Sequence, residues 1–268
     1  MPPAKTVALA VCAHPDDIEF MMAGTLLQLK RAGAEIHMWN LLTGSCGTMQ
    51  YSKEEIVRLR GKEARDAAAV AGATIHAPIR DDLEIFYDHA TLQLVASVMR
   101  EVQPTIVLTH SPQDYMEDHQ NTCRLAVTAA FARGMPNYPV HPPRPTYDAP
   151  MALYHALPHG MCDALRRPIP SGHYVNIEPV LARKREMLAQ HRSQKDWLDV
   201  SQGMDAYLSE MENISRTVGR MSGRFEVAEA WRQHLHLGFG PREYDPLKVL
   251  LGNDCWLDPA YHAETRTP

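Results

Sequence analysis

The chain has 268 residues, 45% of them hydrophobic and 22% charged, which is ordinary for a globular protein and long enough for one large α/β domain. Its formal net charge of −5 gives no excess of Lys and Arg for binding nucleic acid, and no apolar segment approaches the ~20 residues that span a bilayer. The five cysteines are scattered without a CxxC pair, and the start of the chain does not resemble a signal peptide. We therefore expect a cytoplasmic protein without a disulfide framework or a structural zinc site.

The first predicted element is a strand over residues 6–13, an apolar run with β-branched residues that is typical of a strand buried on both faces. It leads directly into HPDD, whose adjacent carboxylates, Asp16 and Asp17, would repel each other. Such a pair indicates that a cation neutralises the carboxylates or that they take part in catalysis. Either aspartate could also simply cap the exposed N–H groups of a helix. A helix over residues 20–31 follows, and Gly33 is placed to end it.

The middle of the chain alternates predicted strands with predicted helices. After a strand over residues 35–43, Ser52 and Glu55 form a capping box that opens a helix ending at Gly72. Strands over residues 73–79, 105–110 and 152–159 then alternate with helices over residues 91–102 and 122–134. This alternation predicts parallel βαβ units in a doubly wound sheet, and therefore an α/β fold of three layers, α/β/α, with a mostly parallel sheet.

From residue 178 onward the pattern becomes helical, with predicted helices over residues 178–198 and 204–221. No linker-like stretch separates this part from the rest. We therefore predict a single domain over residues 1–268, with a catalytic core over about residues 6–177 and a helical extension over about residues 178–268 that packs on the sheet.

Histidines follow the first and the fourth predicted strand. In an open α/β sheet, ligands bind at the carboxyl ends of the strands, and these two strands are neighbours in the common strand order. His14 and Asp17 can therefore meet His119, which opens the helix after the fourth strand. Two imidazoles and one carboxylate, with a position left for water, form a catalytic zinc arrangement. Asp16 is then placed to take a proton from that water.

Several motifs occur in order along the chain and together carry a resemblance. They are AHPDDIEF, GT at 24–25, LLTGSCGT, RGKEA at 60–64, HSPQDYMEDHQNT and HRSQ at 191–194. In this order, over about residues 6–197, they resemble the PIG-L/LmbE family of zinc-dependent N-deacetylases. The glycines of LLTGSCG do not match a dinucleotide fingerprint, so a nicotinamide cofactor is not expected.

The resemblance implies a Rossmann-like LmbE fold and the hydrolysis of an N-acyl group, usually acetyl, from an N-acylglucosamine-type amine. It implies Zn²⁺ as the cofactor, with Fe²⁺ in the same pocket as the alternative, and assigns the ligands to His14, Asp17 and His119. The expected partner is a small amino-sugar substrate, with no nucleic acid and no membrane span. The sequence contains no symmetric signal, and a homo-oligomer is compatible with it.

Further residues receive roles by their place in the motifs. The resemblance makes Asp16 the general base and Asp118 an outer partner that orients or tunes the histidine side of the site. Arg60 and Asp82 fall at positions that hold sugar hydroxyls or phosphate in relatives.

One departure from the family concerns the histidine side of the site. The family commonly has His-Pro-Asp-His where this chain has MEDH, beginning at Met116. The lost histidine is thought to assist the oxyanion or the leaving amine, and methionine cannot donate a proton. His155, His159 and Tyr115 are the candidates to replace it, although His155 is more typical of an ordinary half-buried strand histidine.

Three other functions stay open at this stage. The first is an amidase that cleaves a larger acyl group or a thiol conjugate from such an amine. The second is a non-heme iron oxygenase, because two histidines and a carboxylate also form that metal site; the α/β pattern and the base-like Asp16 count against it. The third is a non-catalytic binding protein with a degenerate site.

Overall fold

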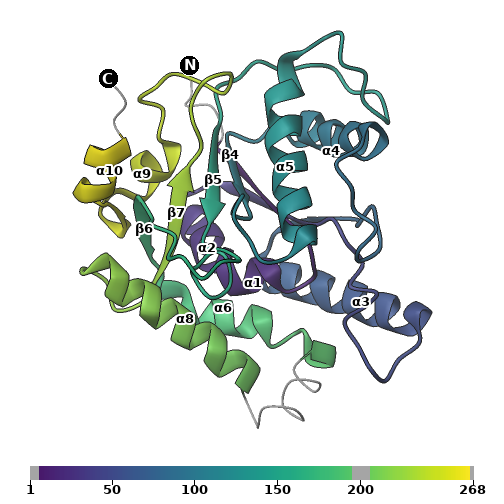
Figure 1. Ribbon diagram of the computed structural model, residues 1–268, viewed down its shortest axis with the longest axis horizontal. Coiled ribbons are helices and arrows are strands. Elements are labelled where there is room, and N and C mark those ends of the chain that lie inside the picture. The colour runs from purple at the N-terminus through teal and green to yellow at the C-terminus, as the bar shows by residue number, and fades with distance from the viewer. Residues whose placement is uncertain (1–5, 195–205, 266–268) are drawn as a thin grey trace.

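The computed structural model is built on one sheet with the strand order β3-β2-β1-β4-β5-β7-β6-β8. Helices pack around this sheet (Figure 1). It describes residues 6–194 and 206–265. The strands in these ranges are β1 (Val7–Cys12), β2 (Glu35–Asn40), β3 (Thr74–His76), β4 (Ile106–Thr109), β5 (Ala152–Ala156), β6 (His173–Asn176), β7 (Ala228–Gln233) and β8 (Cys255–Leu257). From β3 to β5 all neighbours are parallel, whereas β7, β6 and β8 pair antiparallel. The predicted α/β sheet, parallel in most of its pairs, is confirmed.

The connections between strands are mostly helical. The helices are α1 (Asp17–Met21), α2 (Ala23–Arg31), α3 (Lys53–Ala71), α4 (His89–Val102), α5 (Glu117–Phe131), α6 (Leu181–Leu188), α8 (Ala206–Ser222), α9 (Pro246–Leu251) and α10 (Pro259–Thr265). Short 3₁₀ turns lie at Ala132–Gly134, Glu178–Val180 and Gly252–Asp254. Within the described ranges, no helix is both long and apolar enough to cross a membrane.

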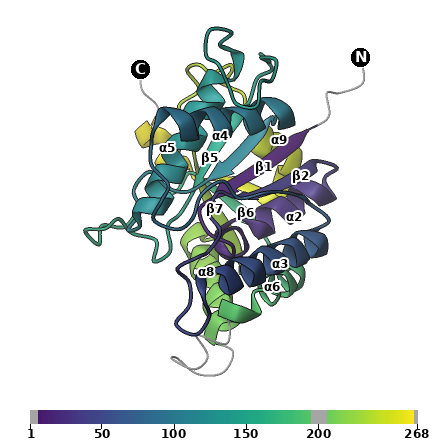
Figure 2. The ribbon, with the colours of Figure 1, turned by 90° about the vertical axis from the view of Figure 1, so that its right-hand side faces the viewer.

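Helices cover both faces of the sheet (Figure 2). Successive side chains of a strand point to opposite faces. In β1, Ala8 and Ala10 accordingly pack into the apolar cluster shared with α2, α3 and α6, whereas Leu9 and Val11 pack into the cluster shared with α4 and α5. Because both faces of β1 are buried, the strand is apolar along its whole length, as the sequence pattern indicated.

The chain between residues 17 and 31 differs from the prediction, because it forms two helices that meet at Met22 and not one helix. Glu229 on β7 accepts hydrogen bonds from the backbone N–H groups of Gly24 at 2.8 Å and Thr25 at 2.7 Å. These N–H groups belong to the first turn of α2 and have no partner within the helix. The carboxylate therefore caps a second helix start. A Cβ atom at Gly24 would lie 2.8 Å from Glu229 Oε1, so the close approach requires glycine.

The part of the chain from residue 178 contributes strands as well as helices, and an ion pair buried within it makes hydrogen bonds to the first two helices of the core. Lys184 on α6 is fully buried, and its Nζ donates to Glu229 Oε1 at 2.8 Å and to the carbonyl of Phe20 at 2.9 Å. The Lys184–Glu229 pair therefore connects α6 and β7 with α1 and α2. The helix predicted over residues 178–198 ends earlier, at Leu188, and its residues 195–198 lie outside the described ranges.

Candidate active site

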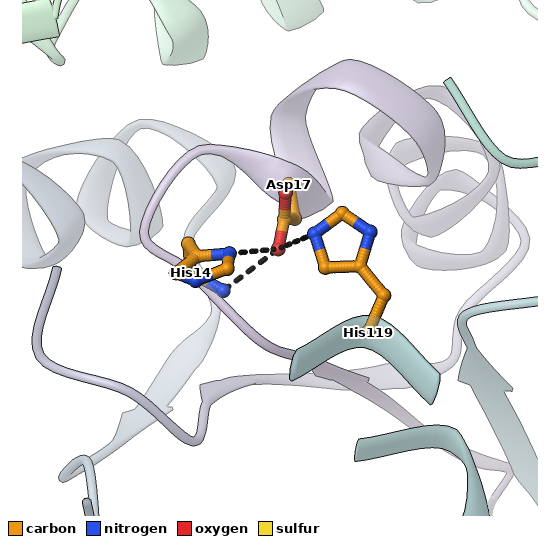
Figure 3. A group of neighbouring side chains, drawn as sticks. All are labelled: His14, Asp17 and His119. Atoms are coloured by element: carbon orange, nitrogen blue, oxygen red, sulfur yellow. Dashed lines mark hydrogen bonds and ion pairs between the residues drawn. The ribbon is translucent and has the colours of Figure 1, made fainter. Parts of the chain in front are cut away.

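The carboxyl ends of β1 and β4 lie at the same edge of the sheet. The two strands pair in parallel, with Val11 opposite Thr109, so the turns that follow them are neighbours. The turn after β1 carries His14 and opens α1 at Asp17, while the first turn of α5 carries His119. Figure 3 shows these three side chains pointing toward one another. Two segments about a hundred residues apart in the sequence thus meet where the strand pattern predicted.

Asp17 lies at the centre of this group. Its Oδ2 is 3.4 Å from His14 Nδ1 and 3.4 Å from His119 Nε2. The same oxygen accepts the backbone N–H of His14 at 2.7 Å, which fixes the carboxylate against the turn. The three potential ligand atoms all lie within 4.8 Å of one another. A single ion could therefore contact one atom of each residue.

Each imidazole is oriented by a further carboxylate. His14 Nε2 lies 3.1 Å from Asp118 Oδ2, and His119 Nδ1 lies 3.1 Å from Asp114 Oδ1. An ionised carboxylate only accepts hydrogen bonds, so these two ring nitrogens carry the protons of the neutral rings. When a metal replaces the second proton of each ring, the lone pairs of His14 Nδ1 and His119 Nε2 face the position beside Asp17, which is how carboxylate–histidine pairs present a metal ligand.

The charges of the group favour a cation. Burial alone would lower the pKa of His14, but Asp118 and Asp17 raise it to about 9. Burial likewise opposes the charge on His119, but Asp17 and Asp114 raise its pKa to about 10. His119 Nε2 is also buried without a hydrogen-bond partner. A divalent cation would give this nitrogen a partner and take the place of the protons, and two imidazoles with one carboxylate suit Zn²⁺.

A second triplet, formed by His110, Asp114 and His119, is also close enough to hold an ion but fits one less well. His110 Nε2 accepts the backbone N–H of Ala13 at 2.9 Å, so that lone pair is already used. Burial and the neighbouring His119 lower the pKa of His110, whose ring stacks on that of His119 at 4.1 Å. His110 therefore packs as a neutral ring behind the group around Asp17.

Asp16 is held in an unusual conformation beside that group. Its φ of 108° lies in the left-handed region, which non-glycine residues seldom adopt outside constrained sites. Its Oδ2 accepts a hydrogen bond from Tyr207 at 2.7 Å, and its Oδ1 lies 3.2 Å from the Arg60 guanidinium. Burial raises the pKa of Asp16 against the opposing charge of Arg60, and Asp17 raises it further. Asp16 is thus an anchored carboxylate with an increased proton affinity.

These groups open into a cavity of about 500 Å³, shaped by the ends of β1, β4 and β5 and by α8. Every side chain singled out in the sequence lines it except His155. The structure places His155 behind the site, where its Nδ1 donates to the carbonyl of His110 at 2.8 Å and its Nε2 lies 2.9 Å from His234 Nδ1. His155 therefore supports the end of β4, whereas Tyr115 and His159 reach the cavity.

Arg60 and Asp82 line the cavity with side chains that are already engaged. Asp82 accepts the backbone N–H groups of Gly44 and Cys46, both at 2.8 Å. Arg60 donates to the carbonyl of Pro15 in addition to its contact with Asp16. In this structure Asp82 fixes the loop after β2, and Arg60 fixes the HPDD turn.

Two residues that shape the site were not singled out in the sequence. Asp114 orients His119 from five positions earlier, inside the DYMEDH segment, where only a search for a carboxylate near the ligand histidine could have found it. Tyr207 binds Asp16 from α8 across 191 positions, and no local pattern indicates that contact.

Two of the weaker motifs contact each other in the fold. Glu63, from the RGKEA segment, accepts the backbone N–H of Ser193 at 2.8 Å and its hydroxyl at 2.7 Å. Gln194 donates to the carbonyl of Gly47 at 2.8 Å. The HRSQ segment therefore ties α3 and the loop after β2 together at the side of the cavity.

Comparisons with known proteins agree with the family predicted from the sequence. Residues 9–130 match the model of the family described as PIG-L: GlcNAc-PI de-N-acetylase. A diacetylchitobiose deacetylase from Thermococcus kodakarensis is 30% identical over 136 residues, 48% of this chain and 51% of the relative. A 4-oxalmesaconate hydratase from Pseudomonas putida is 31% identical over 130 residues, 46% of this chain and 50% of the relative. The chain thus matches about half the length of these curated relatives.

Solved structures resemble the chain over most of its length. An N,N'-diacetylchitobiose deacetylase from Pyrococcus horikoshii matches with a TM-score of 0.72 and 21% identity, over 91% of this chain and 89% of that one. A 4-carboxy-2-hydroxymuconate hydratase from Pseudomonas putida matches with a TM-score of 0.69 and 24% identity, over 90% and 98%. The family resemblance and the LmbE-like fold predicted from the sequence are both confirmed.

Proposed function

Starting from the PIG-L family match over residues 9–130, we propose that this protein is a metal-dependent hydrolase of N-acyl amines. Its substrate is an amino-sugar-like metabolite, and the group removed is an acetyl or a related acyl group. The observation that carries the proposal is the meeting of His14 Nδ1, His119 Nε2 and Asp17 Oδ2, with the anchored carboxylate of Asp16 beside them. The deacetylases among the relatives support it.

His14, Asp17 and His119 would hold the ion, with Zn²⁺ as the proposed metal. When bound there, the metal would supply a water activated for attack and a positive charge for the oxygen of the polarised carbonyl. Asp118 and Asp114 keep the two imidazoles in the tautomers that present lone pairs to that position. The two carboxylates therefore serve the reaction by orienting His14 and His119.

Asp16 is the proposed general base. Attack of water on an amide carbonyl requires a group that takes the water's proton, and departure of the amine requires a group that returns one. The raised pKa of Asp16, caused mainly by burial, suits a carboxyl that alternates between these two states. Tyr207 and Arg60 each bind one of its oxygens and so hold the carboxylate in one orientation.

The donor lost at Met116 has two candidate replacements in the cavity. Tyr115 is only partly buried, and this partial desolvation, together with Asp17 and Asp114, raises its pKa to about 12, so its hydroxyl stays protonated and can donate a hydrogen bond to a developing oxyanion. His159 also lines the cavity. We propose that one of these side chains contacts the carbonyl oxygen or the leaving amine.

A second candidate function is hydration of a carbon–carbon double bond in a carboxylate substrate. It is favoured by the similarity to the 4-oxalmesaconate hydratase of Pseudomonas putida, which is 31% identical over 130 residues. The same activated water and the same base could serve both reactions. The cavity counts against a polyanionic substrate, because the five aspartates that line it carry more charge than a bound divalent ion and Arg60 together.

The decisive experiment measures amine release from N-acetylglucosamine derivatives together with metal content by elemental analysis. The proposal expects one metal ion per chain and amine release that stops when a chelator removes the metal and returns when Zn²⁺ is added. Loss of ultraviolet absorbance from a conjugated unsaturated dicarboxylate, without amine release from any derivative, would favour the hydratase instead. A protein that binds no divalent metal would contradict both functions.

A further inference from the structure

Granting the proposed hydrolase function, we propose that the true substrate carries a bulky, uncharged apolar group next to the scissile amide, and that Leu83 helps to select it. The sugar-like part alone would leave much of the apolar lining of the cavity without a contact. Three features support this inference: the polar groups of the cavity, its apolar wall, and the conformation of Leu83.

Several polar side chains of the cavity already make hydrogen bonds within the protein, mostly to backbone groups. The two oxygens of Asp82 accept the N–H groups of the loop after β2, and Asp118 Oδ2 binds both His14 and the backbone N–H of Leu83. Gln194 gives its amide N–H to the carbonyl of Gly47. A sugar presents many hydroxyl groups that each need a partner when buried. The hydrogen bonds already made within the protein take up part of the capacity of these side chains for such hydroxyls.

Much of the remaining lining of the cavity is apolar. The apolar side chains that line the cavity are Phe20, Met21, Leu83, Met116, Leu157 and Pro158. They come from α1 and from the loops after β3, β4 and β5, so apolar surface reaches the cavity from several directions. Leu83 is 65% exposed, and Tyr115, which also lines the cavity, is 55% exposed. Large apolar side chains that stay exposed beside a cavity are typical of a ligand site.

Leu83 has the least ordinary conformation of these residues. Its φ of 64° lies in the left-handed region, where asparagine and glycine are favoured and leucine is uncommon. The conformation directs its backbone N–H to Asp118 Oδ2 at 3.0 Å, and that carboxylate in turn orients His14. Asparagine could make the same backbone hydrogen bond with less strain. A leucine at this position indicates that the apolar side chain itself is needed for binding.

The charge of the cavity excludes one class of group. The five lining aspartates outweigh the charges of the proposed Zn²⁺ and of Arg60, which is also committed to Asp16 and Pro15, so they would repel a further carboxylate or phosphate on the substrate. An alkyl or aromatic group meets neither this repulsion nor a need for hydrogen bonds. Such a group could belong to the acyl part of the substrate or to the alcohol part attached to the sugar.

Two substrate series with the zinc-loaded protein distinguish these sources. One series is glucosamine bearing N-acetyl, N-butyryl or N-hexanoyl groups, and the other is the methyl and octyl glycosides of N-acetylglucosamine. We expect kcat/KM for amine release to rise at least about tenfold in one series as its apolar group grows. A rise in the first series assigns the apolar group to the acyl part, and a rise in the second assigns it to the alcohol part. Values that stay flat or fall in both series overturn this inference while leaving the hydrolase function intact.

If no compound releases its amine, the proposed function fails and calorimetric binding of the same compounds tests the apolar site separately. Binding at least about tenfold tighter for the hexanoyl or octyl compound supports the site. Equal binding across both series, or no binding at all, overturns it.

Leu83→Asn provides the test at a single residue. Asparagine accepts the left-handed conformation, so the backbone bond to Asp118 and the fold should persist, and the melting temperature should not fall. The preference for the larger group, in kcat/KM or in binding, should decrease at least about fivefold. The matched control is Phe86→Asn, three positions later in the same loop, 60% exposed and not part of the cavity lining. Equal preferences in the two variants would remove Leu83 from the site.

Discussion

The buried ion pair between Lys184 and Glu229 allows a quantitative prediction about how the chain holds together. The Lys184 side chain is fully buried, and the Glu229 side chain is 3% exposed. Replacing Lys184 with Met removes the ion pair at 2.8 Å and the donor to the Phe20 carbonyl at 2.9 Å. Glu229 would remain buried with a negative charge and only the N–H groups of Gly24 and Thr25 to stabilise it.

Breaking one partner of a buried ion pair costs about 3–5 kcal/mol of unfolding free energy. A domain typically has about 5–15 kcal/mol in total, so Lys184→Met should still fold but should unfold at a much lower urea concentration. The neighbouring Arg185 provides the matched control. Its partner is Glu212 at 2.9 Å, and the two side chains are 45% and 29% exposed. An exposed pair of this kind contributes about 0–1 kcal/mol, so Arg185→Met should have little effect.

The assay is equilibrium urea unfolding followed by circular dichroism and by tryptophan fluorescence. If residues 1–268 form the single domain that we predict, both signals should report one transition for the wild type. The double variant Lys184→Met, Glu229→Gln should lose less free energy than the sum of the two single losses, because it no longer buries a lone charge. The reasoning would be refuted if Lys184→Met cost no more than Arg185→Met, or if the two single losses simply added.

Three further predictions concern the site. Asp16→Asn should keep its metal content while kcat for amine release falls at least about a hundredfold; loss of the metal would instead make Asp16 a ligand. His119→Ala should bind metal more weakly when titrated against a chelator, and an unchanged affinity would take His119 out of the ligand set. Met116→His should raise kcat, because an imidazole can donate the proton that methionine cannot; an unchanged kcat would mean that another donor, such as Tyr115 or His159, already serves.

The sequence alone predicted the parts of the site that depend on strand order. His14 and His119 follow strands that were expected to be neighbours, and the parallel pairing of β1 with β4 brings their side chains together. This prediction succeeded because a central strand buried on both faces is an apolar run that can be recognised in the sequence. It also succeeded because ligands in such folds bind at the carboxyl ends of these strands.

The contacts made by side chains across long distances could not be predicted in this way. Tyr207 reaches Asp16 from α8, and Glu229 caps α2 from β7, and neither contact leaves a local pattern in the sequence. The second of these also explains why the helix predicted over residues 20–31 is divided at Met22. His155 was a candidate for the cavity because it follows a strand pattern, but its ring points to the carbonyl of His110.

The bond between Tyr207 and Asp16 also sets an order of events during synthesis of the chain. At about 5–20 residues per second, the 191 positions that separate the two residues take a ribosome roughly 10–40 s to add. His14, Asp17 and His119 are all synthesised well before Tyr207. The three proposed metal ligands are therefore made before the partner that anchors the proposed base. The hydrogen bond that holds Asp16 can form only after α8 has been synthesised and has packed beside it.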